Sequence, residues 1–311
     1  MLFLLLSFAA FLRPIFLLTG QKQTLFSPLP DFLTIIKNKE VSSLNLLFPS
    51  LDNIVKSSVQ KPEVSAKSAL IYDLTTRQTL FVKNPKEKLP MASLTKIMTA
   101  VIAMEHPRKD DKYIVKKEDL VGEDSMGATE GEVYSLDDLL YGMMLHSGND
   151  AAETLATNFP NGRNEFIKAM NSKVKALGLT ETNFTNPTGL EGDGSQHTTA
   201  YDLLVISSFA LNNFPKFDQI IQTFDYDIPY TSTHKEIYLE NETNLLTSYP
   251  GVKGVKDGYT PEAGLCLVTY LDFGEHKIVG VILGSDDRRG EMIELLDYSL
   301  KTLGVTPPNH G

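Results

Sequence analysis

Hydrophobic residues form strand-like runs at both ends of the chain's regular part and helix-like runs between them. Residues 68–74 and 79–82 are apolar, β-rich runs joined by a polar segment, a pattern typical of a hairpin. Residues 265–271 and 277–283 form a second pair of the same kind. Because strands and helices are segregated instead of alternating, the pattern predicts an α+β fold with an antiparallel sheet. The strands of that sheet would come from both ends of the domain.

The central part of the chain predicts several helices, which would form a subdomain inserted between the two pairs of strands. A helix that begins near Met91 should end at His106-Pro107, since proline cannot continue it. Ser135 and Asp138 have the spacing of a capping box at the start of another helix. The later helices are predicted at residues 139–145, from 151 onward, and at 164–177, 199–211 and 291–303. A cleft between the sheet and the helices would be the natural functional site.

The first 19 residues differ from the rest of the chain in being almost entirely apolar. Residues 1–12 carry no charge, and Arg13 and Pro14 interrupt the run before it resumes. The uninterrupted run is short for a spanning helix, which needs about twenty residues. We therefore expect residues 1–19 to be a signal peptide or an N-terminal membrane anchor, with a buried core helix as the alternative. The rest would divide into a linker at 20–64, a folded domain at 65–305 and a tail at 306–311.

Composition and charge argue against several classes of function and of metal site. A net charge of −10 argues against nucleic-acid binding, which usually needs a basic surface. Cys266 is the only cysteine, so the chain has neither an intrachain disulfide nor a cysteine-based metal cluster. The six histidines lack the spacing of known metal motifs. We therefore expect no metal and no other cofactor.

Ser93 and Lys96 are the first candidates for chemistry. Three residues apart at the start of a predicted helix, they would share one face. A serine hydroxyl is a poor nucleophile unless a base lies within hydrogen-bond reach. Lysine can be that base if burial or nearby positive charge lowers its pKa. Taken alone, the pair could equally be a capping serine followed by a surface lysine.

Two further motifs follow in chain order. Ser147-Gly-Asn149 lies between two predicted helices, and Lys256-Asp-Gly258 lies ahead of the second strand pair. Each has a simpler interpretation, because serine, glycine and asparagine are common in turns between helices. Asp-Gly is also a favoured two-residue hairpin turn.

Together the motifs resemble those of the low-molecular-weight penicillin-binding proteins of the D-alanyl-D-alanine carboxypeptidase family. The similar stretches are PMASLTKIMTAVIAME (90–105), YSLDDLLYGMMLHSGNDAAETLA (134–156), FTNPTGL (184–190), HTTAYDLL (197–204) and NLLTSYPGVKGVKDGYTPEAGLCLV (244–268). The resemblance implies a β-lactamase/transpeptidase-like fold. It also implies a serine-type D-Ala-D-Ala carboxypeptidase that removes the terminal D-alanine of peptidoglycan stem peptides.

The resemblance also implies a role for each motif residue. Ser93 would be the acylated nucleophile, Lys96 its general base, and Ser147 the relay that passes a proton to the leaving amine. Asn149 would bind the substrate amide and orient Lys96. The backbone N–H groups of Ser93 and Tyr259 would form an oxyanion hole.

The third motif would bind the substrate's terminal carboxylate, and it contains one departure from the family pattern. Lys256 would attract that carboxylate, Gly258 would let the substrate backbone approach, and Arg288 or its neighbour Arg289 would help to hold it. Family members usually have threonine where this chain has Asp257, an acceptor-only anion. Asp257 would repel a carboxylate unless Lys256 or Arg288 neutralises it or the substrate lacks that group. We therefore expect reduced or altered carboxypeptidase activity.

The implied partners are peptidoglycan stem peptides, β-lactam antibiotics that acylate Ser93, and the cytoplasmic membrane through the N-terminus. The protein would act at the extracytoplasmic face of the cell membrane, in the cell envelope or periplasm, or as a secreted protein. A DD-endopeptidase, a β-lactamase-like hydrolase and a non-catalytic envelope binding protein remain as alternatives. His146 is interpreted as part of the pocket wall, Cys266 as a buried strand residue, and the segment 186–190 as structural.

Overall fold

The computed structural model describes residues 48–310 apart from 53, 193 and 244. The chain divides into two units after Asn45, and the second, Leu46–Gly311, holds all of the described residues. The predicted leader and most of the predicted linker lie outside the described residues. The boundaries proposed for the linker, domain and tail therefore stay predictions.

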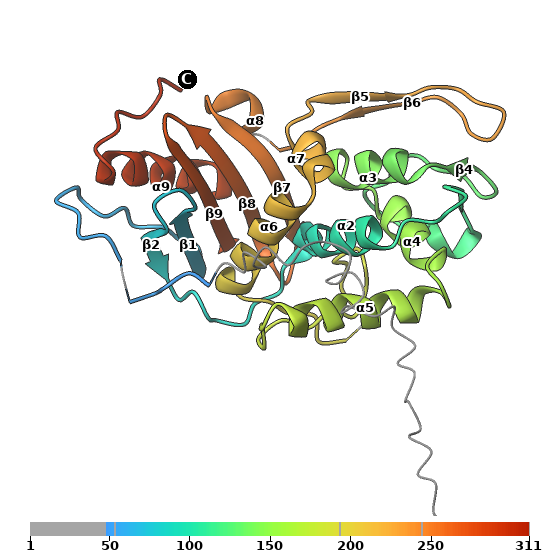
Figure 1. Cartoon of the computed structure of the whole chain (residues 1–311), viewed down its shortest axis with the longest axis horizontal. Helices are drawn as coiled ribbons and strands as arrows, with labels where there is room; N and C mark the ends of the chain where they lie inside the picture. The colour runs from blue at the N-terminus through green and yellow to red at the C-terminus, as the bar shows by residue number, and fades with distance from the viewer. Residues whose placement is uncertain (1–47, 53, 193, 244, 311) are drawn as a thin grey trace, which may run out of the picture. The chain divides into compact units, whose positions relative to one another are not determined.

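A five-stranded antiparallel sheet joins the two ends of this unit (Figure 1). The strands are β1 (Ser68–Asp73), β2 (Gln78–Lys83), β7 (Val252–Thr260), β8 (Gly264–Phe273) and β9 (His276–Ser285), in the order β2-β1-β9-β8-β7. β1 pairs with β9, so that Ser68 lies opposite Leu283. The prediction that segments distant in sequence close one sheet is confirmed, and the fold class is α+β.

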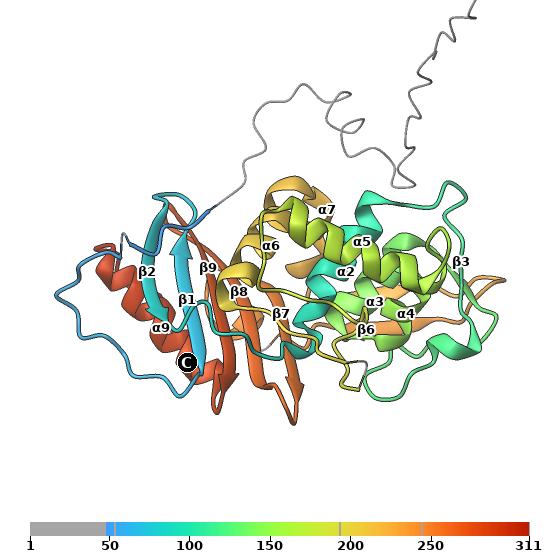
Figure 2. The same cartoon turned by 90° about the horizontal axis from the view of Figure 1, so that it is seen from below.

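The sheet separates two hydrophobic cores, because successive side chains of a strand point to opposite faces. On β1, Leu70 and Tyr72 belong to the larger core, which includes α6 (Ala200–Asn213). Ala69 and Ile71 belong to the smaller core, formed with α9 (Arg288–Thr302). Figures 1 and 2 accordingly show α6 and α9 on opposite faces of the sheet.

Most of the remaining helices form the predicted insertion beside strand β7 (Figure 2). They are η1 (Ala92–Leu94), α2 (Thr95–Glu105), η2 (Lys117–Asp119), α3 (Leu136–Leu145), α4 (Asn149–Thr157), α5 (Arg163–Ala176) and α7 (Pro215–Ile221). The short helix α8 (Leu245–Ser248) instead comes just before β7, and its Leu245 belongs to the smaller core. Ser135 and Asp138 form the capping box predicted for α3, each side chain accepting a hydrogen bond from the other's backbone N–H. α2 ends at Glu105, just before the proline, as predicted.

The hydrophobic pattern did not predict several of the strands or two of the α-helices. They are β7, α7, α8, the short pair β3 (Tyr113–Ile114) and β4 (Val133–Tyr134), and the hairpin of β5 (Asp225–Ile228) and β6 (Ile237–Glu240). The hairpin-tip interpretation of the third motif is wrong, since Lys256, Asp257 and Gly258 lie inside β7. The continuous ladder with β8 keeps this segment extended.

The described residues on either side of the predicted 65–305 domain also contact it. Val55 N donates to Thr79 O at 3.0 Å, and Val59 and Val64 pack against the α9 core. His310, in the predicted tail, stacks on Tyr249. Within the described part of the chain, no helix has the length and apolar character needed to cross a membrane.

Candidate active site

Ser93 lies on η1, in the segment that leads directly into α2. The preceding residue, Ala92, has φ +47°, a left-handed conformation that is rare for residues other than glycine. Ser93 keeps part of its surface exposed, while its neighbours on both sides are buried. The strained turn thus presents one serine from a rigid, otherwise buried segment.

Lys96 lies one turn further along and is fully buried. Its Nζ atom lies 2.9 Å from Ser93 Oγ, 2.7 Å from Asn149 Oδ1 and 2.9 Å from Thr188 O. A neutral amine has two hydrogens and one lone pair. If the amide oxygen and the carbonyl accept the two hydrogens, the lone pair faces the serine hydroxyl. This is the arrangement that a general base for Ser93 needs.

The surroundings of Lys96 also favour its neutral form. Burial and, second to it, the positive charge of Lys256 lower the pKa of Lys96 to about 7, against smaller opposing effects of Asp124 and Asp257. An ammonium group in a site that excludes water loses its hydration, which is the dominant cause. Near neutral pH a large share of the Lys96 side chains can therefore accept a proton.

The second motif lies where α3 ends and α4 begins. Ser147 is buried and has φ +55°, and Asn149 is the first residue of α4. Asn149 Nδ2 is buried and has no hydrogen-bond partner among the described residues. Since Oδ1 already accepts from Lys96, this N–H group is the one that a substrate carbonyl would satisfy. The interpretation of this motif as a turn between helices is correct, and the turn also carries site residues.

The junction is held in place by the next residue, Asp150. Its buried carboxylate accepts hydrogen bonds from the backbone N–H groups of Met126 and Ala128 at 3.0 Å each, and from Ser125 Oγ at 2.5 Å. These contacts attach the start of α4 to the loop before α3. They fix the position from which Asn149 reaches Lys96.

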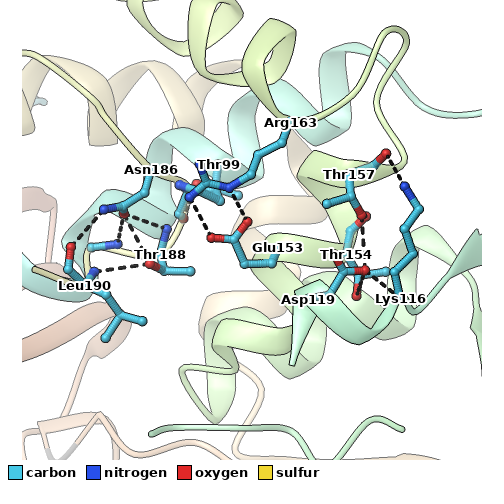
Figure 3. A network of polar contacts seen from close by, with 12 residues as sticks. Thr99, Lys116, Asp119, Glu153, Thr154, Thr157, Arg163, Asn186, Thr188 and Leu190 are labelled. Carbon is cyan, nitrogen blue, oxygen red and sulfur yellow. Dashed lines mark hydrogen bonds and ion pairs between the residues drawn. The ribbon is translucent and has the colours of Figure 1, made fainter. Parts of the chain in front are cut away.

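A turn at residues 186–190 borders Lys96 through the Thr188 carbonyl. Figure 3 shows the hydrogen bonds that Asn186 and Thr188 make within this turn. Asn186 Oδ1 accepts from Gly189 N at 2.7 Å, and Asn186 Nδ2 donates to Leu190 O at 2.8 Å. Gly189 has φ +95°, and a Cβ atom there would lie 1.9 Å from Ala92 O. The sequence-based interpretation of this turn as merely structural missed the Thr188 carbonyl, a direct partner of Lys96. A glycine after Asn-Pro-Thr was the one available signal of a close approach.

Strand β7, the edge of the sheet, forms the remaining side of the site. A Cβ atom on Gly258 would lie 2.8 Å from Ser93 N, so only glycine lets the strand approach the nucleophile this closely. Tyr259 follows with an exposed side chain, and Lys256 is 1% exposed. The four segments that carry the three motifs and the 186–190 turn therefore meet at one place. A separate cavity of about 210 Å³ lies beside α9, and none of the predicted site residues lines it.

Residues 55–287 match the family model described as D-alanyl-D-alanine carboxypeptidase. The chain belongs to this family. It is 34% identical over 254 residues to the D-alanyl-D-alanine carboxypeptidase DacF of Bacillus subtilis, covering 78% of this chain and 64% of the relative. It is also 34% identical to a D-alanyl-D-alanine endopeptidase of Escherichia coli, covering 78% of each chain. The chain thus spans less than two thirds of the length of the Bacillus relative.

Solved structures show the same relationship. The crystal structure of the Streptomyces K15 DD-transpeptidase matches with a TM-score of 0.73 at 29% identity, covering 78% of this chain and 100% of that chain. The predicted fold family is therefore correct.

In this chain, each carboxylate oxygen of the third-motif aspartate, Asp257, contacts a cation. Asp257 Oδ1 lies 3.0 Å from Lys256 Nζ, and Oδ2 accepts a short hydrogen bond from Arg288 Nη2. Burial opposes ionisation of Asp257, but the two cations outweigh it and hold the pKa of the carboxyl below its usual value. Of the two arginines considered from the sequence, Arg288 is the one that contacts the motif.

Glu242 is a further residue near the site that the sequence did not indicate. Its carboxylate lies 3.3 Å from His146 Nδ1, next to the second motif. Burial raises the pKa of Glu242, with the charges of Lys256 and His146 acting in the opposite direction. Both side chains are partly exposed, which fits the interpretation of His146 as part of the site's wall.

Cys266 takes no part in this arrangement. It is fully buried on β8, as predicted, and burial raises the pKa of its thiol to about 11, which keeps it protonated and unreactive. Among the residues that the structure describes, no cluster of three or more histidine, cysteine, aspartate or glutamate side chains could hold a metal ion.

Proposed function

We propose that this protein is a serine-type DD-peptidase that acts on peptidoglycan stem peptides as a D-Ala-D-Ala carboxypeptidase, through an acyl-enzyme on Ser93. The observation that carries the proposal is the 2.9 Å contact between Lys96 Nζ and Ser93 Oγ, with Asn149 Oδ1 and Thr188 O available to accept the two hydrogens of the neutral amine. The family membership and the names of the relatives agree with it.

In the proposed first step, neutral Lys96 takes the proton of the Ser93 hydroxyl. Ser93 Oγ then forms a bond to the carbonyl carbon of the penultimate D-alanine. The oxyanion is stabilised by the backbone N–H groups of Ser93 and Tyr259, and donors of this kind typically contribute about 3 kcal/mol each. The close approach of Gly258 to Ser93 N supports this placement of the oxyanion.

In the second half of acylation, the C–N bond breaks and the proton moves to the leaving amine. Ser147 would pass that proton from Lys96, and the free Asn149 Nδ2 would hold the substrate amide carbonyl. Water then attacks the acyl group, which releases the shortened peptide and restores Ser93. Lys256 and Arg288, whose charges Asp257 partly offsets, would face the leaving residue.

We further infer that the reaction takes place outside the cytoplasm, at the membrane face, in the envelope or periplasm, or after secretion. The apolar residues 1–19 support export, as a cleaved signal peptide or as an anchor in the cytoplasmic membrane. Peptidoglycan, the proposed substrate, is assembled on that side of the membrane.

A DD-endopeptidase is the second candidate, because a relative of equal sequence identity bears that name. The same acylation chemistry would then cut a cross-link instead of a terminal residue. The two activities differ only in the amine that leaves.

The test uses two acylating probes on the full chain. A D-alanyl thioester of a neutral thiol reports acylation by thiol release, and a saturating fluorescent penicillin reports a covalent adduct by intact mass. We expect both signals from the wild type and from Ser195→Ala, a control at an exposed serine, and neither from Ser93→Ala. Equal signals from wild type and Ser93→Ala would contradict the proposal. Rapid loss of the penicillin adduct would instead indicate a β-lactamase.

A further inference from the structure

The Asp257 carboxylate lies between two cations, Lys256 of the third motif and Arg288 of α9. One oxygen contacts Lys256 Nζ at 3.0 Å and the other contacts Arg288 Nη2. The three side chains are largely buried, with exposed fractions of 13% for Asp257, 1% for Lys256 and 18% for Arg288. The cations therefore already have an anionic partner before any substrate arrives.

The geometry also resists displacement of this carboxylate. Arg288 Nη1 donates to Gly258 O at 2.8 Å while Nη2 contacts Asp257, so the guanidinium bridges two consecutive residues of β7. Removing one partner of a buried ion pair leaves an uncompensated charge, which is strongly unfavourable. The lowered pKa of Asp257 keeps the carboxyl ionised at neutral pH.

A threonine at this position would leave Lys256 and Arg288 with two positive charges and a hydroxyl donor for a substrate carboxylate. With Asp257, the three side chains carry a net charge of +1 instead of +2, and an arriving carboxylate meets the fixed negative charge between the two cations. Like charges brought together in a desolvated site discriminate strongly against the wrong ligand.

We propose that Asp257 is a specificity-determining residue that makes this site select substrates whose leaving residue lacks a free α-carboxylate. The proposal rests on the acylation of Ser93 proposed above and narrows its substrate class: removal of a D-alanine with a free carboxylate becomes the slower of two reactions at the same site. The favoured leaving group is an amine that carries a neutral hydrogen-bond donor, such as a carboxamide, in place of the α-carboxylate. The reason is that Asp257 accepts hydrogen bonds and donates none. A D-alanyl bond to a carboxamide-bearing or carboxylate-free amine is the expected target.

The test compares two N-acyl-D-Ala-D-Ala substrates that differ only in a terminal carboxylate or carboxamide. For the wild type we expect a higher kcat/KM on the carboxamide. Asp257→Thr should shift the ratio of the two kcat/KM values toward the free acid by at least about tenfold. Asp257→Asn, which removes the charge at constant size, should shift it in the same direction. Asp272→Thr, an equal charge change at an exposed position of β8, should leave the ratio unchanged.

Thiol release from the neutral D-alanyl thioester separates this proposal from the one on which it rests. If the wild type releases thiol through Ser93 but prefers the free acid, or if both Asp257 variants keep the wild-type ratio, the specificity proposal alone is wrong. If no release depends on Ser93, both proposals are wrong. Should Asp257→Thr fail to fold, as judged by thermal unfolding, the isosteric Asp257→Asn decides the question.

Discussion

Lys96 Nζ and Asn149 Oδ1 lie 2.7 Å apart, although the two residues are separated by 53 positions and belong to different helices. This contact joins the first motif to the second and leaves the amide N–H of Asn149 for another partner. The same lysine contacts the nucleophile, so one buried amine fixes the relative positions of three elements. The geometry leads to four predictions.

The first prediction concerns the pH dependence of acylation. Because the pKa of Lys96 is lowered to about 7 and the neutral amine is the proposed base, the rate should rise with pH and level off above 8. At pH 6 it should be roughly tenfold below the plateau, as expected one unit below a pKa. Thiol release from the neutral thioester, measured from pH 5.5 to 9, gives the midpoint.

Two neighbouring charges should move this midpoint in opposite directions. Lys256 lowers the pKa of Lys96 and Asp257 raises it to a smaller extent, so Lys256→Gln should shift the midpoint upward and Asp257→Asn should shift it downward by less. Lys253→Gln, which removes a positive charge elsewhere on β7, is the matched control and should leave it in place. A midpoint that is the same in all four proteins would exclude Lys96 as the titrating base.

The second prediction is that Asn149→Ala lowers kcat/KM on the thioester by about 10²-fold, a typical contribution of a group that orients a general base. The variant removes both the acceptor for Lys96 and the free amide donor. Asn213→Ala, at an exposed asparagine, should have no effect. Activity in Asn149→Ala within threefold of the wild type would contradict the assigned role.

The third prediction is that Gly258→Ala reduces acylation more than tenfold while the protein stays folded. The added Cβ would meet Ser93 N at 2.8 Å and would obstruct the proposed oxyanion donor, which typically contributes about 3 kcal/mol. Gly122→Ala is the control, since its Cβ would have open space. Penicillin labelling measures acylation of Ser93, and circular dichroism shows whether the variant is folded. Normal labelling of Gly258→Ala would show that the strand does not approach Ser93 so closely.

The fourth prediction concerns stability at the helix junction. Asp150→Asn places an amide N–H₂ group where the carboxylate accepted hydrogen bonds from backbone donors, including Met126 and Ala128. Leaving such buried donors unpaired should lower the free energy of unfolding by about 2 kcal/mol. Urea denaturation measures the change. Asp272→Asn should change it by less than about 0.5 kcal/mol, as surface substitutions usually do, and an equal effect in both variants would refute the role of Asp150.

The sequence by itself determined the elements with strong local signals. The capping box of Ser135 and Asp138 and the proline after His106 act within a few residues of the chain, so the ends of α3 and α2 could be predicted. Strand β7 could not be predicted in this way, because its glycines and charges have low strand propensity. Its extended conformation comes from pairing with β8, which is a tertiary property.

The same division holds for the site. The sequence provided the three motifs and their order, and a resemblance provided their expected roles. Only the tertiary structure decided that Lys96 is buried beside Ser93, that the Thr188 carbonyl holds it, and that Asp257 lies between Lys256 and Arg288. A pKa or an ion pair depends on burial and on charges from distant segments. Residue identity fixes which groups are available, whereas their protonation and partners follow from where the fold places them.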